Sequence, residues 1–119
     1  MVNAHSEAIV PLVVRSTDSS ELDVEAILDT GFNGSLTLPT AVIDRLGLSW
    51  RGRGLAILAN GAEEQCDLYG ATVVWDGNPR RILVESAETE PLLGMALLRG
   101  YLLRVQVTEG GSLIIEALP

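Results

Sequence analysis

The sequence has few of the residues on which several common kinds of protein depend. It holds one cysteine, Cys66, and one histidine, His5, so neither an intramolecular disulfide nor a four-ligand cysteine and histidine zinc site can form. Basic residues are scarce: 8 stand against 16 acidic ones, which gives a formal net charge of −8. A chain of this charge repels phosphate backbones and anionic lipid, so we expect neither nucleic acid nor a membrane surface as a partner.

Long hydrophobic runs are missing as well. No apolar run reaches the roughly 18 residues that a membrane-spanning helix needs, and residues 1–15 lack the pattern of a signal peptide. We therefore expect a soluble cytoplasmic protein. The 119 residues are 47% hydrophobic, which is enough for one core, and no linker, low-complexity stretch or charge block divides them. The expectation is a single domain over residues 1–119.

Short strand-forming segments separated by turn residues occupy most of the chain. The clearest is residues 21–28, in which Leu22, Val24, Ala26 and Leu28 alternate with acidic residues, as in a half-buried strand. The Asn60-Gly61 pair is typical of a tight hairpin turn. The remaining strands are expected at residues 8–15, 35–38, 55–58, 65–75, 81–85, 102–107 and 113–117.

Two segments favour short helices instead. One opens at Pro39 and ends at Gly47, and the other is the Ala-, Leu- and Met-rich run of residues 92–100. With about eight strands and two short helices, the chain is expected to form an all-β fold. Its predicted architecture is a small, closed, mainly antiparallel β-barrel with a projecting hairpin.

Asp29, Thr30 and Gly31 directly follow the alternating strand. A carboxylate at the end of an apolar strand is costly to ionise unless donors or a proton-sharing partner surround it, so Asp29 is the candidate for acid–base chemistry. Gly31 lets the backbone approach a peptide closely. By itself the triplet also fits an Asx-type turn, and the segments around it decide between the two interpretations.

Residues 26–39, Ala-Ile-Leu-Asp-Thr-Gly-Phe-Asn-Gly-Ser-Leu-Thr-Leu-Pro, resemble the active-site strand and loop of retropepsin-like (retroviral-type) aspartic proteases. In that family a second motif, two hydrophobic residues and a glycine, begins a closing helix. Here Leu92-Leu93-Gly94 matches it, with Gly94 65 positions after Asp29. The Asn60-Gly61 hairpin lies where the family has its flap. The resemblance extends over residues 8–115 and is nearest to bacterial-type single-domain members.

The resemblance implies an aspartic endopeptidase that acts as a homodimer on peptide or protein substrates and needs no metal or other cofactor. One chain supplies one Asp-Thr-Gly, so Asp29 of each of two chains would form the catalytic dyad. Thr30 would hold the two loops together. Residues 112–119 would pair between subunits, or alternatively complete the barrel of their own chain. The implied catalytic residues are Asp29, Thr30 and Gly31, and the implied substrate-binding residues are Phe32, Asn33, Gly34, Ala59, Asn60, Gly61, Leu93 and Gly94.

The sequence also departs from the viral pattern. Phe32-Asn33-Gly34 replaces Ala-Asp-Asp, and Met95 replaces an arginine, so both members of an ion pair are missing together. Phe32 could narrow the cleft or cover Asp29. This leaves two alternatives open: a catalytically weak or inactive peptide-binding module with the same fold, and an unrelated small β-barrel.

The other polar and aromatic residues are expected to have structural roles. His5 is assigned to a frayed N-terminus and Cys66 to a small buried position. Trp50 and Trp75 are expected in core or rim packing. Surface charges are expected at Glu63, Glu64, Glu85, Glu88, Glu90, Arg51, Arg53, Arg80 and Arg81.

Overall fold

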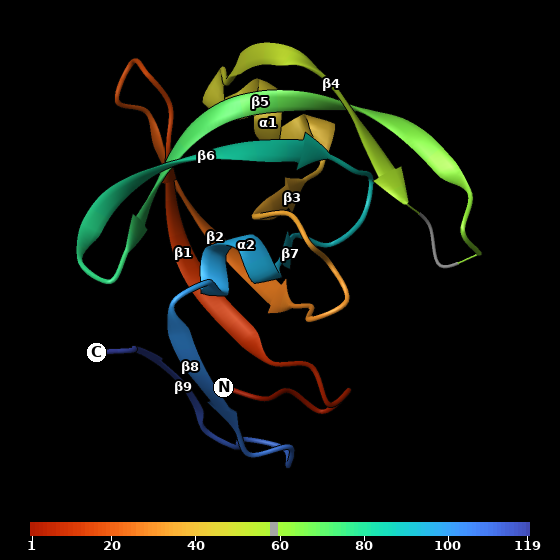
Figure 1. Cartoon of the computed structure of the whole chain (residues 1–119). Helices are drawn as coiled ribbons and strands as arrows, with labels where there is room; N and C mark the ends of the chain where they lie inside the picture. The colour runs from red at the N-terminus through yellow and green to blue at the C-terminus, as the bar shows by residue number, and fades with distance from the viewer. Residues whose placement is uncertain (58–59) are drawn as a thin grey trace.

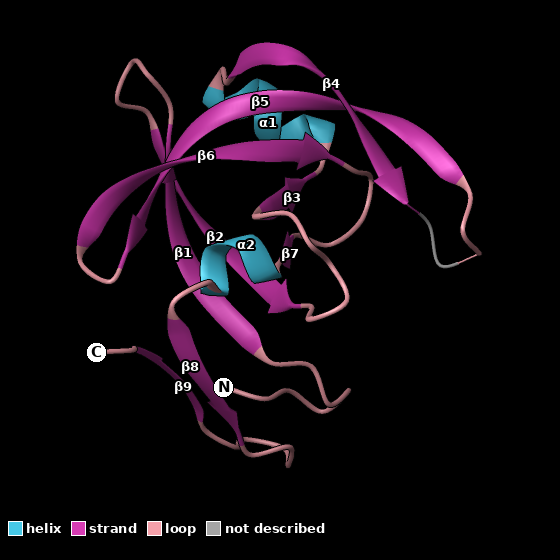
Figure 2. Cartoon of the chain, in the orientation of Figure 1, coloured by secondary structure: helices cyan, strands magenta, loops and turns pink. Residues whose placement is uncertain are grey.

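A computed structural model describes residues 1–57 and 60–119, and strands dominate it (Figure 2). The two helices are α1 (Thr40–Leu46) and α2 (Met95–Leu98). The strands are β1 (Ile9–Arg15), β2 (Glu21–Leu28), β3 (Leu36–Leu38), β4 (Ser49–Ile57), β5 (Glu63–Trp75), β6 (Asn78–Ser86), β7 (Leu92–Leu93), β8 (Tyr101–Val105) and β9 (Leu113–Ala117).

Seven of the strands form one curved sheet in the order β1-β2-β7-β3-β6-β5-β4. A further antiparallel pairing of β1 with β5, Val14 opposite Val73 and Arg15 opposite Thr72, joins the sheet to itself. Six strands therefore make a ring, and β4 lies outside it on β5. All pairings are antiparallel except β2 with β7 and β3 with β6. The all-β expectation is confirmed.

The core lies inside this ring, and it follows from the alternation of apolar residues in the strands. Val10, Leu12 and Val14 of β1 are buried, and the partner strand β2 buries Val24 and Ala26. Alternate residues of one strand point to opposite faces, so the acidic residues of β2 face water. The core is completed by fully buried side chains from other elements, including Leu36, Leu38, Ile43, Val73, Val84, Leu93 and Leu97.

Helix α1 begins and ends as the sequence predicts. Pro39 precedes it, and Gly47 closes it in the left-handed conformation (φ +64°), where its N–H donates to the Asp44 and Ile43 carbonyls. Ile43 and Leu46 point into the core. The helix thus covers one side of the ring (Figure 1).

The predicted helix over residues 92–100 is only half right. Leu92 and Leu93 form β7, which pairs with β2 on one side and β3 on the other, and the helix is confined to Met95–Leu98. The Ala, Leu and Met content favours helix locally, but the backbone groups of Leu92 and Leu93 are held by two neighbouring strands. Tertiary pairing therefore overrides local propensity here.

The β4–β5 hairpin is longer than the sequence predicts. Strand β4 begins at Ser49, although Gly52 and Gly54 are unfavourable in a strand, and the register shifts between Trp50 and Gly52. Gly52 adopts φ +131°, so the glycine permits this bulge. The hairpin projects from the body of the molecule (Figure 1). The predicted strand end at Leu58 lies outside the described residues.

Strands β8 and β9 form a separate two-stranded sheet at the opposite end of the molecule from the projecting hairpin (Figure 1). Tyr101 of β8 packs edge-on against the buried Trp75, with ring centroids 5.7 Å apart, which attaches this sheet to the ring. The N-terminal segment is held here rather than frayed. Val2 is buried, and its N–H donates to the Gly111 carbonyl at 3.0 Å.

Among the described helices, none has the length and apolar character needed to cross a bilayer.

Candidate active site

Asp29 lies directly after β2, where the chain leaves the sheet. Its backbone N–H donates to the Leu93 carbonyl of β7 at 2.9 Å, and its Oδ1 accepts the Gly31 N–H at 2.9 Å. The carboxylate is partly exposed to solvent. The strand pair therefore fixes the backbone of Asp29, and the loop orients its carboxylate.

The loop after Asp29 rests on the turn at Gly94. The Phe32 carbonyl accepts the Met95 N–H at 2.8 Å, and the Gly34 carbonyl accepts the Ala96 N–H at 3.1 Å. A Cβ placed on Gly94 would lie 2.2 Å from the Gly34 carbonyl oxygen. The structure therefore brings together the two motifs that the sequence placed 65 positions apart.

The predicted site residues of this loop differ in their surroundings. Thr30 is exposed, and its hydroxyl makes no hydrogen bond within the described part of the chain. Phe32 is half-buried, and its ring lies against Gly34 and Gly94. Asn33 is exposed and lines a shallow hollow. Leu93 and Gly94 are buried beneath the loop, so they support it.

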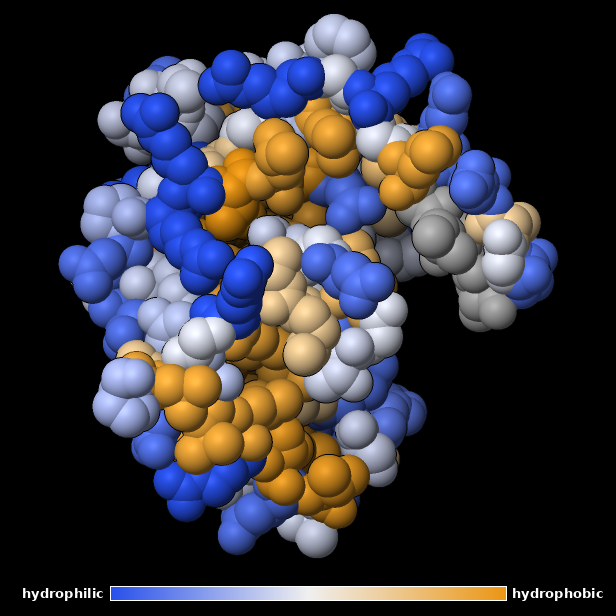
Figure 3. All heavy atoms as spheres, viewed as in Figure 1, coloured by the Kyte–Doolittle hydropathy of each residue, from blue (hydrophilic) through white to orange (hydrophobic). Residues whose placement is uncertain are grey.

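The predicted flap residues lie apart from the Asp29 loop in this single chain. Asn60 and Gly61 are exposed at the turn of the β4–β5 hairpin, where Gly61 has φ +81° and Asn60 Oδ1 accepts the Ala62 N–H at 2.9 Å. Ala59 lies outside the described residues. The hairpin overhangs an open recess at the edge of the molecule (Figure 3). The turn of the hairpin lies apart from the loop between β2 and β3, which carries Asp29 (Figure 1).

Two residues that the sequence assigned to the surface, Glu85 and Arg80, contact the Asp29 loop or the helix beneath it. Glu85 of β6 is half-buried, and its Oε2 lies 2.2 Å from the position that a Cβ on Gly34 would take. Cys66 Sγ is 3.7 Å from Glu85 Oε1. Burial raises the pKa of the Glu85 carboxyl, an effect that the Cys66 thiol partly offsets. Burial and the nearby Glu85 charge also raise the pKa of Cys66, which does not favour a nucleophilic thiolate.

Arg80 is the second of these residues. Its Nη1 and Nη2 donate to the Leu97 and Ala96 carbonyls, at 3.3 and 3.1 Å. Both carbonyls belong to α2, the helix that begins next to Gly94. A guanidinium at a helix C-terminus satisfies carbonyl groups that have no partner within the helix. Arg80 therefore stabilises α2, the helix beneath the loop after Asp29. The arginine falls in a turn-rich sequence, and no local signal indicated this contact.

The raised pKa of Glu85 gives a testable pH dependence of stability. Between the ordinary glutamate pKa, about 4.3, and the raised value, the folded chain binds more protons than the unfolded chain. The free energy of unfolding therefore falls as pH rises through this interval. Glu85→Gln should remove that slope and raise the stability at pH 7, but not at pH 4, by under about 1 kcal/mol because the group is partly solvated.

Urea unfolding at the two pH values measures the difference, and Glu88→Gln is the matched control. The Thr40 hydroxyl and N–H hydrogen-bond Glu88 Oε1 and lower its pKa, so its contribution is present at neutral pH and is lost as pH falls. Glu88→Gln should therefore destabilise the chain at pH 7. A Glu85→Gln variant less stable than the parent at pH 7 would show that burial does not control this carboxyl.

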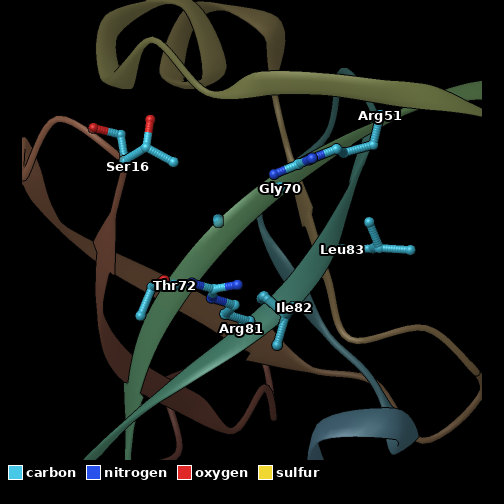
Figure 4. A pocket seen from close by; sticks show the side chains of 9 residues that line it. Ser16, Arg51, Gly70, Thr72, Arg81, Ile82 and Leu83 are labelled. Carbon is cyan, nitrogen blue, oxygen red and sulfur yellow. The ribbon is translucent and has the colours of Figure 1, made fainter.

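A surface hollow of about 680 Å³ lies elsewhere, on the outer face of β5 and β6 (Figure 4). Arg51 and Arg81 line it together with Thr72, and the Arg51 guanidinium lies beside Gly70. The predicted catalytic and substrate-binding residues within the described ranges do not line it. It is therefore distinct from the candidate site.

The fold is that of the retropepsins. A solved structure of the EIAV protease, in complex with the inhibitor HBY-793, aligns with this chain at a TM-score of 0.62. The alignment covers 83% of this chain and 91% of the viral one, at 22% sequence identity. At that identity the similarity establishes the fold. No protein-family model matches the sequence. A search of curated proteins also finds no match.

Proposed function

We propose that this chain is an aspartic endopeptidase that hydrolyses peptide bonds as a homodimer. The observation that carries the proposal is the setting of Asp29. Its backbone is held between β2 and β7, its Oδ1 is oriented by the Gly31 N–H, and its side chain reaches solvent. The retropepsin fold and the hairpin that overhangs the neighbouring recess support the same conclusion.

The proposed chemistry needs two such carboxylates. At about 3 Å and an effective dielectric near 20, two ionised groups would repel by roughly 5 kcal/mol, so the pair keeps one proton. The ionised Asp29 takes a proton from a water molecule that attacks the scissile carbonyl carbon. The protonated Asp29 of the other chain donates to the carbonyl oxygen. As the C–N bond breaks, the Asp29 that took the water proton passes it to the leaving nitrogen, and a hydroxyl of the tetrahedral intermediate returns a proton to the other Asp29. Thr30 and Gly31 shape the loop that presents the carboxylate.

The second carboxylate comes from a second copy of the chain. The Thr30 hydroxyl is available to bond a partner loop, since it has no acceptor within residues 1–57 and 60–119. At the β8–β9 end, exposed apolar side chains of Leu102, Ile114 and Leu118 offer contact area (Figure 3). Strand β9 pairs with β8 of its own chain, so an intersubunit sheet would form along its other edge.

In the proposed complex, an extended peptide lies in the recess between the Asp29 loop and the β4–β5 hairpin. Phe32, Asn33 and Gly34 would contact it from the loop, and the hairpin residues 59–61 would close over it. Leu93 and Gly94 act through the loop that they support. The single cysteine is compatible with a reducing compartment such as the cytoplasm.

The alternative is a peptide-binding module with little turnover. It is favoured by Phe32, whose ring packs on Gly34 and Gly94 where the viral pattern has a small alanine. Incubation of an unfolded protein between about pH 3 and 8 separates the two functions. The peptidase should cleave best below neutral pH and be blocked by a statine-type peptide, which mimics the tetrahedral intermediate. Peptide binding without cleavage at any pH would favour the module.

A further inference from the structure

The Glu85 carboxylate lies beside the loop that follows Asp29, although Glu85 belongs to a distant part of the sequence. Glu85 is opposite Thr37 of β3 and Leu68 of β5. Its side chain extends to Gly34, the fifth residue after Asp29, where the missing Cβ leaves room for Oε2. Any side chain at position 34 would have to displace this carboxylate. The glycine therefore permits a negative group beside the loop that carries Asp29.

No cation of the described chain pairs with this carboxylate. The ion pairs within residues 1–57 and 60–119 join Arg15 with Glu21, Arg53 with Asp67, and Arg104 with Glu116. Within the described residues, the hydrogen-bond donor to the Glu85 carboxylate is the Cys66 thiol at 3.7 Å, which is a weak donor. A half-buried carboxylate without a strong partner is unfavourable in the free chain. A cation brought by a ligand would supply that partner.

An aromatic ring adjoins the carboxylate. The Cζ and Cε1 atoms of Phe32 lie 2.5 and 2.7 Å from the same Cβ position of Gly34 that Glu85 Oε2 approaches to 2.2 Å. Ring edge and carboxylate therefore meet at one point of the loop. An apolar surface next to an acceptor suits a lysine or arginine side chain, because the aliphatic stem packs on the ring while the charged head reaches the oxygen.

The other charges of the chain also favour a cationic peptide. Glu63 and Glu64 lie on the hairpin strand β5, Glu90 lies on the segment before β7, and the chain carries a net charge of −8. A cationic peptide is attracted to such a surface, and an acidic one is repelled. Residues of an extended peptide follow one another every 3.3 Å or so. Glu85 reaches Gly34, which belongs to the same loop as Asp29, so a peptide bound along this loop would present a nearby residue to Glu85.

We propose that Glu85 determines specificity by selecting a lysine or arginine side chain close to the scissile bond, with the Phe32 ring packing against its stem. This rests on the peptidase function proposed above and names its substrate class as basic peptides.

The test is digestion of a peptide library of broad composition with the parent chain, Glu85→Gln and Glu85→Lys. The parent should show lysine and arginine enriched at one position within a few residues of the cut. On peptides with lysine or arginine at that position, Glu85→Gln should lower kcat/KM about tenfold. On peptides with norleucine at the same position, it should lower kcat/KM little. Glu85→Lys should shift the preference to aspartate and glutamate. Glu109→Gln, which removes an exposed carboxylate between β8 and β9, should keep the parent's preference.

A separate binding experiment distinguishes failure of the inference about Glu85 from failure of the proposed peptidase function. Fluorescence anisotropy compares a lysine-containing peptide with its norleucine analogue on Asp29→Asn, with and without Glu85→Gln. The preference for lysine should appear on Asp29→Asn and disappear with Glu85→Gln. No cleavage together with this preference would overturn the peptidase function and keep the role of Glu85. Cleavage or binding without a basic preference, or a preference that Glu85→Gln retains, would overturn the inference.

Discussion

Asp29→Asn is expected to abolish peptide cleavage, by at least about 10³-fold, while the chain remains folded. Asparagine has nearly the same shape as aspartate, and its Oδ1 can still accept the Gly31 N–H. Its amide cannot take a proton from water or return one to the leaving group. A mutant dimer therefore has two inert groups where the reaction needs one acid and one base.

The fold should tolerate this change because the backbone contacts of Asp29 do not involve the carboxylate. The N–H still donates to the Leu93 carbonyl. In the dimer, replacing two adjacent acids removes their mutual repulsion, so the melting temperature at neutral pH should stay equal or rise. Cleavage of an unfolded protein and thermal melts measure both expectations.

Asp23→Asn is the control for the loss of one negative charge. Asp23 is exposed on β2, the same strand that leads to Asp29, and its replacement should leave cleavage unchanged. If Asp29→Asn cleaves as fast as the parent, Asp29 is a turn residue and the proposed mechanism is wrong.

Gly94→Ala is expected to give the largest loss of stability, about 3 kcal/mol, or roughly 10 °C in melting temperature. The backbone conformation of Gly94, φ −109° and ψ −179°, suits alanine, so no dihedral strain arises. The cost is steric. The new methyl group would lie 2.2 Å from the Gly34 carbonyl oxygen and 2.6 Å from that of Phe32. Both are backbone atoms, so the backbone of the loop after Asp29 must move.

Gly54→Ala is the matched control. Gly54 lies in β4, and the nearest atoms to a Cβ there belong to the Leu68 side chain, at 3.1 Å or more, which can adjust. Differential scanning calorimetry should show a small change for Gly54→Ala and a large one for Gly94→Ala, together with lower cleavage. Equal melting temperatures would mean that the active loop does not pack on Gly94 as described.

Much of the fold could be predicted because local signals coincide with tertiary structure. The alternation of residues 21–28 defines β2, and Pro39 and Gly47 bound α1. The prediction failed at β7, where two residues are too few to show periodicity and the strand exists through its pairing with β2 and β3. The start of β4 was missed because its glycines oppose strand formation while β5 supplies the hydrogen bonds.

The Asp-Thr-Gly triplet is visible in the sequence because it is contiguous, whereas its structural surroundings are not. Glu85 reaches Gly34 across about fifty positions of sequence, and its environment depends on where β6 runs beside β3. Arg80 reaches α2 in the same way. The sequence around a charged residue in a polar segment does not indicate that its side chain makes such a contact. Side-chain packing between distant segments is therefore what the structure adds.

The most direct test of the central claim is the activity of mixtures of the parent chain and Asp29→Asn at constant total concentration. If each active unit needs Asp29 from two chains, activity follows the square of the parent fraction, so an equal mixture that has exchanged subunits retains about one quarter of the parent activity. This is the result that a shared dyad predicts. If the equal mixture retains half, each chain works alone, and the dyad of two Asp29 carboxylates is contradicted.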